Sequence, residues 1–112
     1  MSTELVLDRD PIERGTLIVT AKFRNEKGEA MIPNAGLAWS LYRKDGSYVN
    51  DRQQVSITSN SEVSMVLTGE DLPRGDLFLL IEGTYNSEIN GVFTQDLPIR
   101  DECCFQVQPT IN

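Results

Sequence analysis

The two cysteines of the chain, Cys103 and Cys104, stand side by side in the stretch DECCFQVQ. Adjacent thiols could form a metal site, a redox switch or a strained disulfide. A four-ligand zinc site needs further Cys or His residues, and this sequence has no histidine. Neighbouring residues of a β-strand point to opposite faces, which opposes both a shared metal and a disulfide. The sequence therefore predicts two free thiols, Cys103 facing a core and Cys104 facing outward, as in a reducing cytosol.

The absence of histidine also removes most catalytic constellations. A Ser-His-Asp or Cys-His nucleophile cannot be built from this chain, and no glycine-rich phosphate-binding loop is present. We therefore expect no enzymatic activity, no catalytic residue and no cofactor.

Loop carboxylates are the remaining candidates for metal binding. Carboxylates at the rim of a sandwich can bind calcium, although solvated turn residues are the commoner explanation of such spacing. The interpretation is that the chain has no metal site, with calcium left open for two groups: Asp8, Asp10 and Glu13, and Glu70, Asp71 and Asp76.

Charge and length limit the class of protein. The chain has 112 residues and a net charge of −7, so we expect one domain, residues 1–112, that repels phosphate backbones and does not bind nucleic acid. No apolar run approaches the ~20 residues of a membrane span. The first ten residues, MSTELVLDRD, lack the pattern of a secretory signal, so we expect synthesis in the cytoplasm and no membrane partner.

The elements that must position any site show the two-residue period of β-strands. Alternation predicts strands over residues 16–24, 36–43, 62–68, 76–85 and 97–107, and two shorter ones over 3–7 and 53–57. Between them, residues 25–36 read as a long loop, Asp45-Gly46 as a tight turn, 68–75 as a single helical turn, and 86–91 as a turn-rich loop. No segment has a helical period over ~11 residues.

This pattern predicts a single immunoglobulin-like antiparallel β-sandwich of about seven strands, with core strands over about 16–108. Trp39 falls on the third strand, at the position where immunoglobulin-like domains often bury a tryptophan. Tyr85 could tie an inter-sheet connection, but filling the core is the commoner role of such a tyrosine.

Surfaces for binding other molecules are the remaining candidates once catalytic and metal sites are excluded. The polar loop over Gly46–Val55 carries Tyr48, Asp51 and Arg52, and the outer face of the 76–85 strand carries Phe78 and Leu80. Tyr and Arg are enriched in protein interfaces, and an apolar stripe outside the core tends to be covered. These five residues are the predicted interface. Most aromatic residues fall at inward-facing positions of the strands. The exceptions are Tyr42, Tyr48, Phe78 and Phe93. Exposed aromatic residues leave a carbohydrate- or cell-surface-binding module as the alternative function.

An ordered set of segments resembles a known group of proteins. These segments are AKFRNEKGEAMIPNAGLAWSLYRKDGSYVNDRQQVSI, SEVSMVLTGEDL, LFLLIEGTY and LPIRDECCFQV, within residues 16–108. Together they resemble small immunoglobulin-like β-sandwich proteins associated with the virions of tailed bacteriophages and prophages. The paired cysteines are not part of that pattern.

The resemblance implies a non-enzymatic structural protein located in the virion and made in the host cytoplasm. Its partners would be other virion proteins at the capsid surface, as in capsid decoration, or at the head–tail or tail joint, in a symmetric multi-copy assembly. We also expect the terminal segments, Met1–Leu7 and Pro109–Asn112, to dock on neighbouring molecules, where a terminal segment could add a strand to a neighbour's sheet.

Overall fold

The computed structural model describes residues 2–55 and 61–109, and this part of the chain is almost entirely β-structure. One 3-10 turn, η1 (Gly69–Asp71), lies where the single helical turn was predicted. No helix of the described residues is long and apolar enough to cross a membrane. The seven strands are β1 (Ser2–Leu7), β2 (Thr16–Arg24), β3 (Ala38–Arg43), β4 (Tyr48–Gln54), β5 (Glu62–Thr68), β6 (Gly75–Ile89) and β7 (Val92–Val107).

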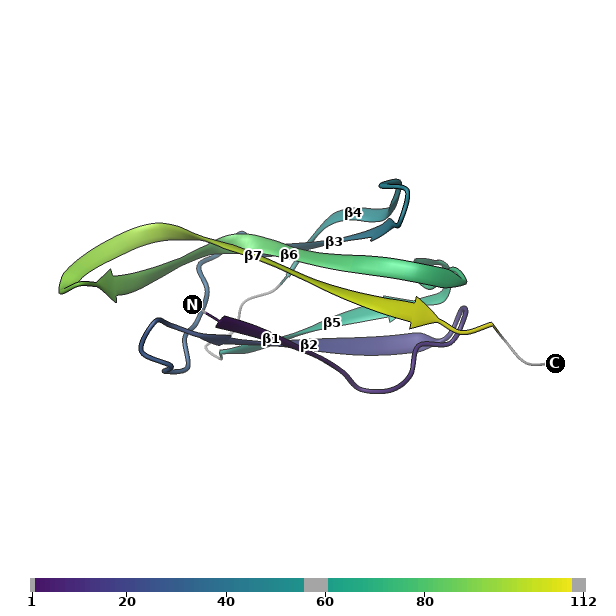
Figure 1. The fold of residues 1–112 in the computed structure, drawn as a ribbon, viewed down its shortest axis with the longest axis horizontal. Coiled ribbons are helices and arrows are strands. Elements are labelled where there is room, and N and C mark those ends of the chain that lie inside the picture. The colour runs from purple at the N-terminus through teal and green to yellow at the C-terminus, as the bar shows by residue number, and fades with distance from the viewer. Residues whose placement is uncertain (1, 56–60, 110–112) are drawn as a thin grey trace.

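The strands form two sheets that lie one above the other (Figure 1). The three-stranded sheet has the order β1-β2-β5 and the four-stranded sheet the order β4-β3-β6-β7, with every paired strand antiparallel. Strand β4 pairs with β3 instead of extending the first sheet, as the fourth strand does in constant-type immunoglobulin domains. The predicted antiparallel β-sandwich is confirmed.

The core lies between the sheets because alternate residues of each strand point inward. The burial of β2 and β5 alternates as the sequence predicted, and Trp39 is only 7% exposed. Burying each large apolar side chain contributes about 1.5–3 kcal/mol to stability. The largest fully buried side chains include Leu17, Phe23, Leu41, Met65, Leu67, Leu79 and Ile81.

The predicted polar loop over residues 46–55 is wrong, because most of it forms the edge strand β4. The tight turn is confined to residues 43–47, where the Arg43 N–H donates to the Ser47 carbonyl and Gly46 has a φ of 90°. The strand predicted over 53–57 therefore begins at Tyr48, and residues 56 and 57 lie outside the described residues. The alternation signal was weak here because β4 is polar on an edge and carries a bulge.

The predicted turn-rich loop over residues 86–91 is also wrong. Strand β6 continues to Ile89 and β7 begins at Val92, so the two strands form one long hairpin. Its tip is the pair Asn90-Gly91, with φ values of 51° and 80°, which is the backbone of a tight hairpin turn. The hairpin extends past the end of the sandwich as a two-stranded ribbon (Figure 1).

The N-terminal segment, for which docking on a neighbouring molecule stays a prediction, is an edge strand of the chain's own sandwich. Ser2–Leu7 is strand β1 of the chain's own three-stranded sheet, paired with β2, so the core strands begin before residue 16. The end of β7 is held by the β1–β2 loop, since the Glu13 N–H donates to the Gln108 carbonyl at 2.8 Å. Met1 and residues 110–112 lie outside the described residues.

A tyrosine and a serine fasten the base of the ribbon to the loop after β2. The Tyr85 hydroxyl donates to the Glu26 carboxylate, and Ser87 Oγ donates to its other oxygen at 2.9 Å. The Tyr85 hydrogen bond, more than the bond from Ser87, lowers the pKa of Glu26 to about 2. Tyr85 thus combines a core position, at 5% exposure, with a tie between the two layers of the fold.

Candidate functional site

An aromatic row crosses the outer face of the four-stranded sheet. Register places Tyr48 of β4 opposite Tyr42 of β3, and Tyr42 opposite Phe78 of β6. The Tyr42 and Phe78 rings stack with centroids 5.4 Å apart, and the Tyr42 and Tyr48 rings meet edge to face at 6.1 Å. Cys104 follows in the same row on β7 and is exposed. We call Tyr42, Tyr48 and Phe78 the aromatic row.

The next row of the same face is buried at two of its three residues and exposed at Glu102. Ser40, Leu80 and Glu102 are aligned across β3, β6 and β7, and Ser40 and Leu80 are only 3% and 7% exposed. Leu80 therefore lies on the predicted outer face but is buried there by its neighbours, so it cannot contact a partner directly. The alternation in the sequence predicts that Leu80 points outward, but it does not show that neighbouring side chains cover it.

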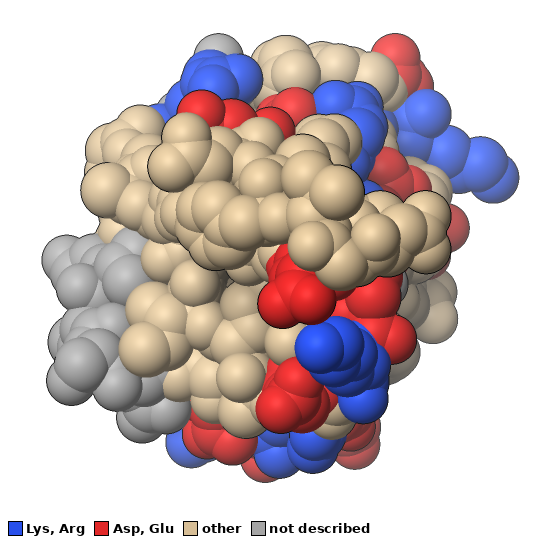
Figure 2. All heavy atoms as spheres, turned by 90° about the vertical axis from the view of Figure 1, so that its left-hand side faces the viewer, with Lys and Arg blue, Asp and Glu red and all other residues tan. Residues whose placement is uncertain are grey.

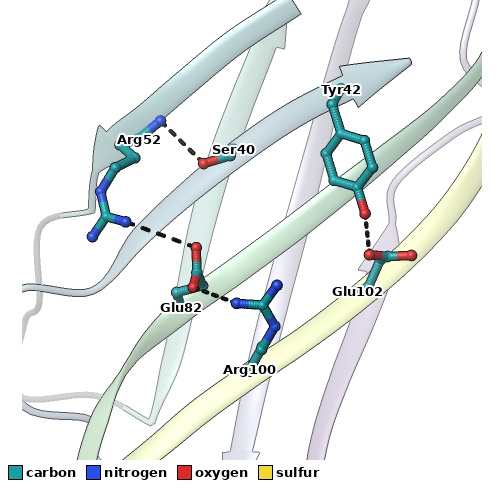
Figure 3. A network of polar contacts seen from close by, with 6 residues as sticks. All are labelled: Ser40, Tyr42, Arg52, Glu82, Arg100 and Glu102. Carbon is teal, nitrogen blue, oxygen red and sulfur yellow. Dashed lines mark hydrogen bonds and ion pairs between the residues drawn. The ribbon is translucent and has the colours of Figure 1, made fainter. Parts of the chain in front are cut away.

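A bulge in β4 positions an arginine beside this covered row. Residues 51 and 52 lie opposite the single residue Ser40, and Arg52 has a φ of 46°, in the left-handed region. The Arg52 N–H donates to Ser40 Oγ at 3.1 Å, which satisfies a hydroxyl that would otherwise be buried without a partner. The bulge directs the Arg52 side chain across the face of the sheet (Figure 3).

Two arginines share one carboxylate on this face (Figure 3). Glu82 of β6 lies between them, with Arg100 Nη1 2.7 Å from one carboxylate oxygen and Arg52 Nη1 3.9 Å from the other. The arginine side chains are 65% and 69% exposed, so these ion pairs add little stability. Five N–H donors on each guanidinium leave capacity for a further acceptor.

The Tyr42 hydroxyl completes the polar contacts by donating to the Glu102 carboxylate (Figure 3). This hydrogen bond, with a smaller contribution from burial, raises the pKa of Tyr42 to about 12. The bond and the stacking on Phe78 hold the central ring of the aromatic row in one orientation.

A groove opens beside the arginines, where β6 and β7 leave the sandwich. Its volume is about 410 Å³, and Gly36, Glu82, Pro98 and the two arginines Arg52 and Arg100 line it. Gly83 and Ile99 add further apolar lining, and Thr84 adds a hydroxyl that accepts a hydrogen bond from Asn34 Nδ2. We call it the arginine groove.

The loop carboxylates do not converge on a metal site. The described residues contain no group of three or more His, Cys, Asp or Glu side chains able to hold an ion. Asp8 accepts from the Ile18 N–H at 2.9 Å, and this bond lowers its pKa. Asp71 accepts from Asn50 Nδ2 at 2.9 Å. These two carboxylates therefore accept hydrogen bonds from strands β2 and β4.

The cysteines face opposite ways, as predicted. Cys103 is half-buried against the core, and burial raises the pKa of its thiol to about 11. Cys104 is exposed at the end of the aromatic row, and both cysteines are free.

Four of the five predicted interface residues, Tyr48, Arg52, Phe78 and Leu80, do share one face of the four-stranded sheet. The fifth, Asp51, belongs to β4, and its side chain lies outside what the structure describes. The sequence pattern alone did not single out Glu82 and Arg100, which complete the polar network. The alternation in the sequence places Glu82 and Arg100 on the outer face, but only the register of β6 and β7 brings them beside Arg52.

Comparison with known proteins gives the fold alone. No family profile and no curated protein matches the sequence. A similar solved structure is the crystal structure of MtrC from Shewanella baltica OS185, with a TM-score of 0.58 and 13% sequence identity. The match covers 96% of this chain and 22% of that chain, so the sandwich corresponds to about a fifth of the length of MtrC.

Proposed function

We propose that this chain is a non-enzymatic structural protein of a tailed-phage virion that binds a partner protein through the outer face of its four-stranded sheet. The observation that carries the proposal is the aromatic row, which shares its face with an exposed arginine pair beyond the buried Ser40 and Leu80. Tyrosine and arginine are the residues that most often dominate the energy of protein interfaces.

The aromatic row is ordered before any partner arrives. Tyr42 is held by Phe78 on one side and by the hydrogen bond to Glu102 on the other, and Tyr48, which is 56% exposed, packs against its edge. Side chains that are already fixed lose little conformational entropy on binding. The row is therefore suited to act as a rigid contact surface.

The virion setting is the finer part of the proposal and is supported by the resemblance of residues 16–108 to virion-associated sandwich proteins. Partners would be other virion proteins at the capsid surface or at the head–tail or tail joint. The net charge of −7 agrees with a protein that contacts proteins rather than packaged nucleic acid.

A carbohydrate-binding module is the alternative, because aromatic side chains on a sheet can stack on sugar rings. Here the Tyr42 and Phe78 rings lie nearly parallel, at 14°, with their faces against each other. Each ring therefore gives up a face that a sugar would need, which favours a protein partner.

The proposal is tested by co-sedimentation with purified shells, necks and tails of the phage or prophage whose genome encodes the chain. We expect the wild-type protein to bind one of these particles, and Tyr42→Ala/Tyr48→Ala to bind at least about tenfold more weakly. Val66→Ser is the matched control, because Val66 is 55% exposed on the other sheet. Binding to none of the particles, or binding to a glycan array that depends on Tyr48, would reject the proposal.

A further inference from the structure

The tip of the β6–β7 ribbon carries two adjacent exposed apolar residues. Val92 and Phe93 are 64% and 65% exposed, immediately after the tight Asn90-Gly91 turn. The ribbon projects past the sandwich, so the tip reaches beyond the rest of the molecule (Figure 1). A large aromatic side chain left in water at the end of a rigid hairpin is a candidate anchor for a pocket on another molecule.

The charge around this tip is of one sign. Residues 83–99 contain Glu88 and Asp96 but no Lys or Arg, and Glu88 lies opposite Phe93 in the hairpin. In the end-on view, the surface of the tip side includes a broad band free of charged residues, with acidic side chains next to it (Figure 2). An apolar tip with acidic neighbours is repelled by an anionic lipid surface and fits an apolar pocket with basic groups at its rim.

The arginine groove has these properties. Gly36 and Pro98 provide an uncharged wall, and Arg52 and Arg100 stand at its rim with only the Glu82 carboxylate between them. The Glu88 carboxylate of an incoming tip would give each guanidinium a carboxylate of its own.

A tip cannot enter the groove of its own chain. Gly83 and Pro98, at the groove, and Ile89 and Val92, at the tip, belong to the same two continuous strands. Ile89 lies six residue steps along the strand from Gly83, a distance of about 20 Å. The contact must therefore join two molecules.

We propose that the ribbon tip of one copy, with Phe93 as the anchor and Glu88 as the counter-charge, docks in the arginine groove of a second copy. Because every copy carries both a tip and a groove, the contact can close as a two-fold dimer in which each tip enters the other copy's groove, or continue head-to-tail into rings or open chains. This inference goes beyond the proposed function, since the aromatic row takes no part in it.

Net charge acts against this contact at long range only. Two copies at −7 repel each other, but at about 0.15 M salt the screening length is about 8 Å, which leaves the close Glu88–arginine contacts less affected. Association should therefore be weak in very dilute salt and stronger at physiological ionic strength.

The test is sedimentation velocity of the full chain over a range of concentrations at about 0.15 M salt. We expect the wild-type protein to associate as concentration rises, and Phe93→Ser and Arg100→Ala each to weaken association at least about tenfold. Val66→Ser, an equally exposed apolar residue on the other sheet, should associate like the wild-type protein. Thermal unfolding of each variant checks that the sandwich remains folded.

A mixing experiment makes the test specific. Phe93→Ser keeps an intact groove and Arg100→Ala keeps an intact tip, so an equimolar mixture should form one-to-one dimers that grow no further. A wild-type protein that stays monomeric, a mixture that forms no dimer, or association lost in Val66→Ser but retained in Phe93→Ser would each overturn the proposal. None of these results would bear on binding through the aromatic row.

Discussion

Two tyrosine hydroxyls in this protein donate hydrogen bonds to glutamates that are distant in sequence. Tyr85 donates to Glu26, and Tyr42 donates to Glu102. The pKa of Tyr85 is raised to about 12, mainly by burial and then by its hydrogen bond. The pKa of Tyr42 is also raised to about 12, mainly by its hydrogen bond and then by burial. The first bond fastens the ribbon base to the loop after β2. The second orients the aromatic row.

The Glu26 contact predicts a specific dependence of stability on pH. Its pKa falls from 4.5 to about 2 on folding, so the folded state favours the charged carboxylate. The resulting stabilisation is complete above pH 4.5 and is lost as pH falls toward 2. We expect Glu26→Gln to melt below the wild-type temperature at pH 6, and the gap to narrow as pH falls through that range.

Thermal melts of both proteins between about pH 6 and pH 2.5 measure this gap. Tyr85→Phe removes the main donor to the carboxylate, so its gap to the wild-type protein should narrow in the same way. A gap that stays constant over the whole range would contradict the assignment of Glu26.

Among the elements, β3 and β6 depart most from simple alternation. Ala38 and Ser40 of β3 are 3% exposed although they point away from the core, because β4 and β6 flank them with long side chains. Gly83 of β6 lies where the loop before β3 crosses it. Close packing on both sides makes these central strands the least tolerant part of the four-stranded sheet.

We expect Gly83→Ala to destabilise the fold by about 1–3 kcal/mol. A Cβ at this position would lie 2.7 Å from Leu37 Cδ1 and 3.2 Å from Leu37 Cα. The Leu37 side chain can rotate away, but its backbone cannot move without disturbing the start of β3. Urea unfolding measures the change, with Gln106→Ala at an exposed site of the same sheet as a control expected within about 0.5 kcal/mol of the wild-type value. A neutral Gly83→Ala would show that the loop before β3 adjusts freely.

At the scale of the whole molecule, the protein is a sandwich with a projecting ribbon, and its longest extent is 57 Å against 25 and 20 Å. The core ends near Tyr85 on β6 and Ile99 on β7, before the tip begins. The apolar residues of the tip are therefore not part of the core, which separates folding from the proposed contact between copies.

Shortening the ribbon should leave the sandwich folded. Ser87 and Thr94 are partners in the hairpin, so replacing residues 88–93 by Asn-Gly closes it with a two-residue turn. We expect the melting temperature to change by less than about 5 °C, because few buried contacts are lost. Circular dichroism melts check stability, and sedimentation should show no association. A shortened protein that fails to fold would mean that the tip supports the core.

The sequence by itself determined the positions of β1, β2, β3 and β5, of the first part of β6 and of the last part of β7. It also determined the seven-strand antiparallel class, the opposite facing of the two cysteines and the lack of any histidine-based site. These follow from local periodicity and composition. It did not determine β4 or the ribbon, because polar edge strands and exposed hairpins have no core face to impose a clear alternation.

Only the tertiary structure decided which outward residues form a surface. Tyr48, Tyr42 and Phe78 come from three strands, and Arg52 and Arg100 from two edge strands that never pair with each other. Their proximity depends on strand order, on register and on the two register shifts between β3 and β4. A shift of one residue in register would turn each of these side chains to the opposite face, so long-range pairing rather than local sequence created the candidate site.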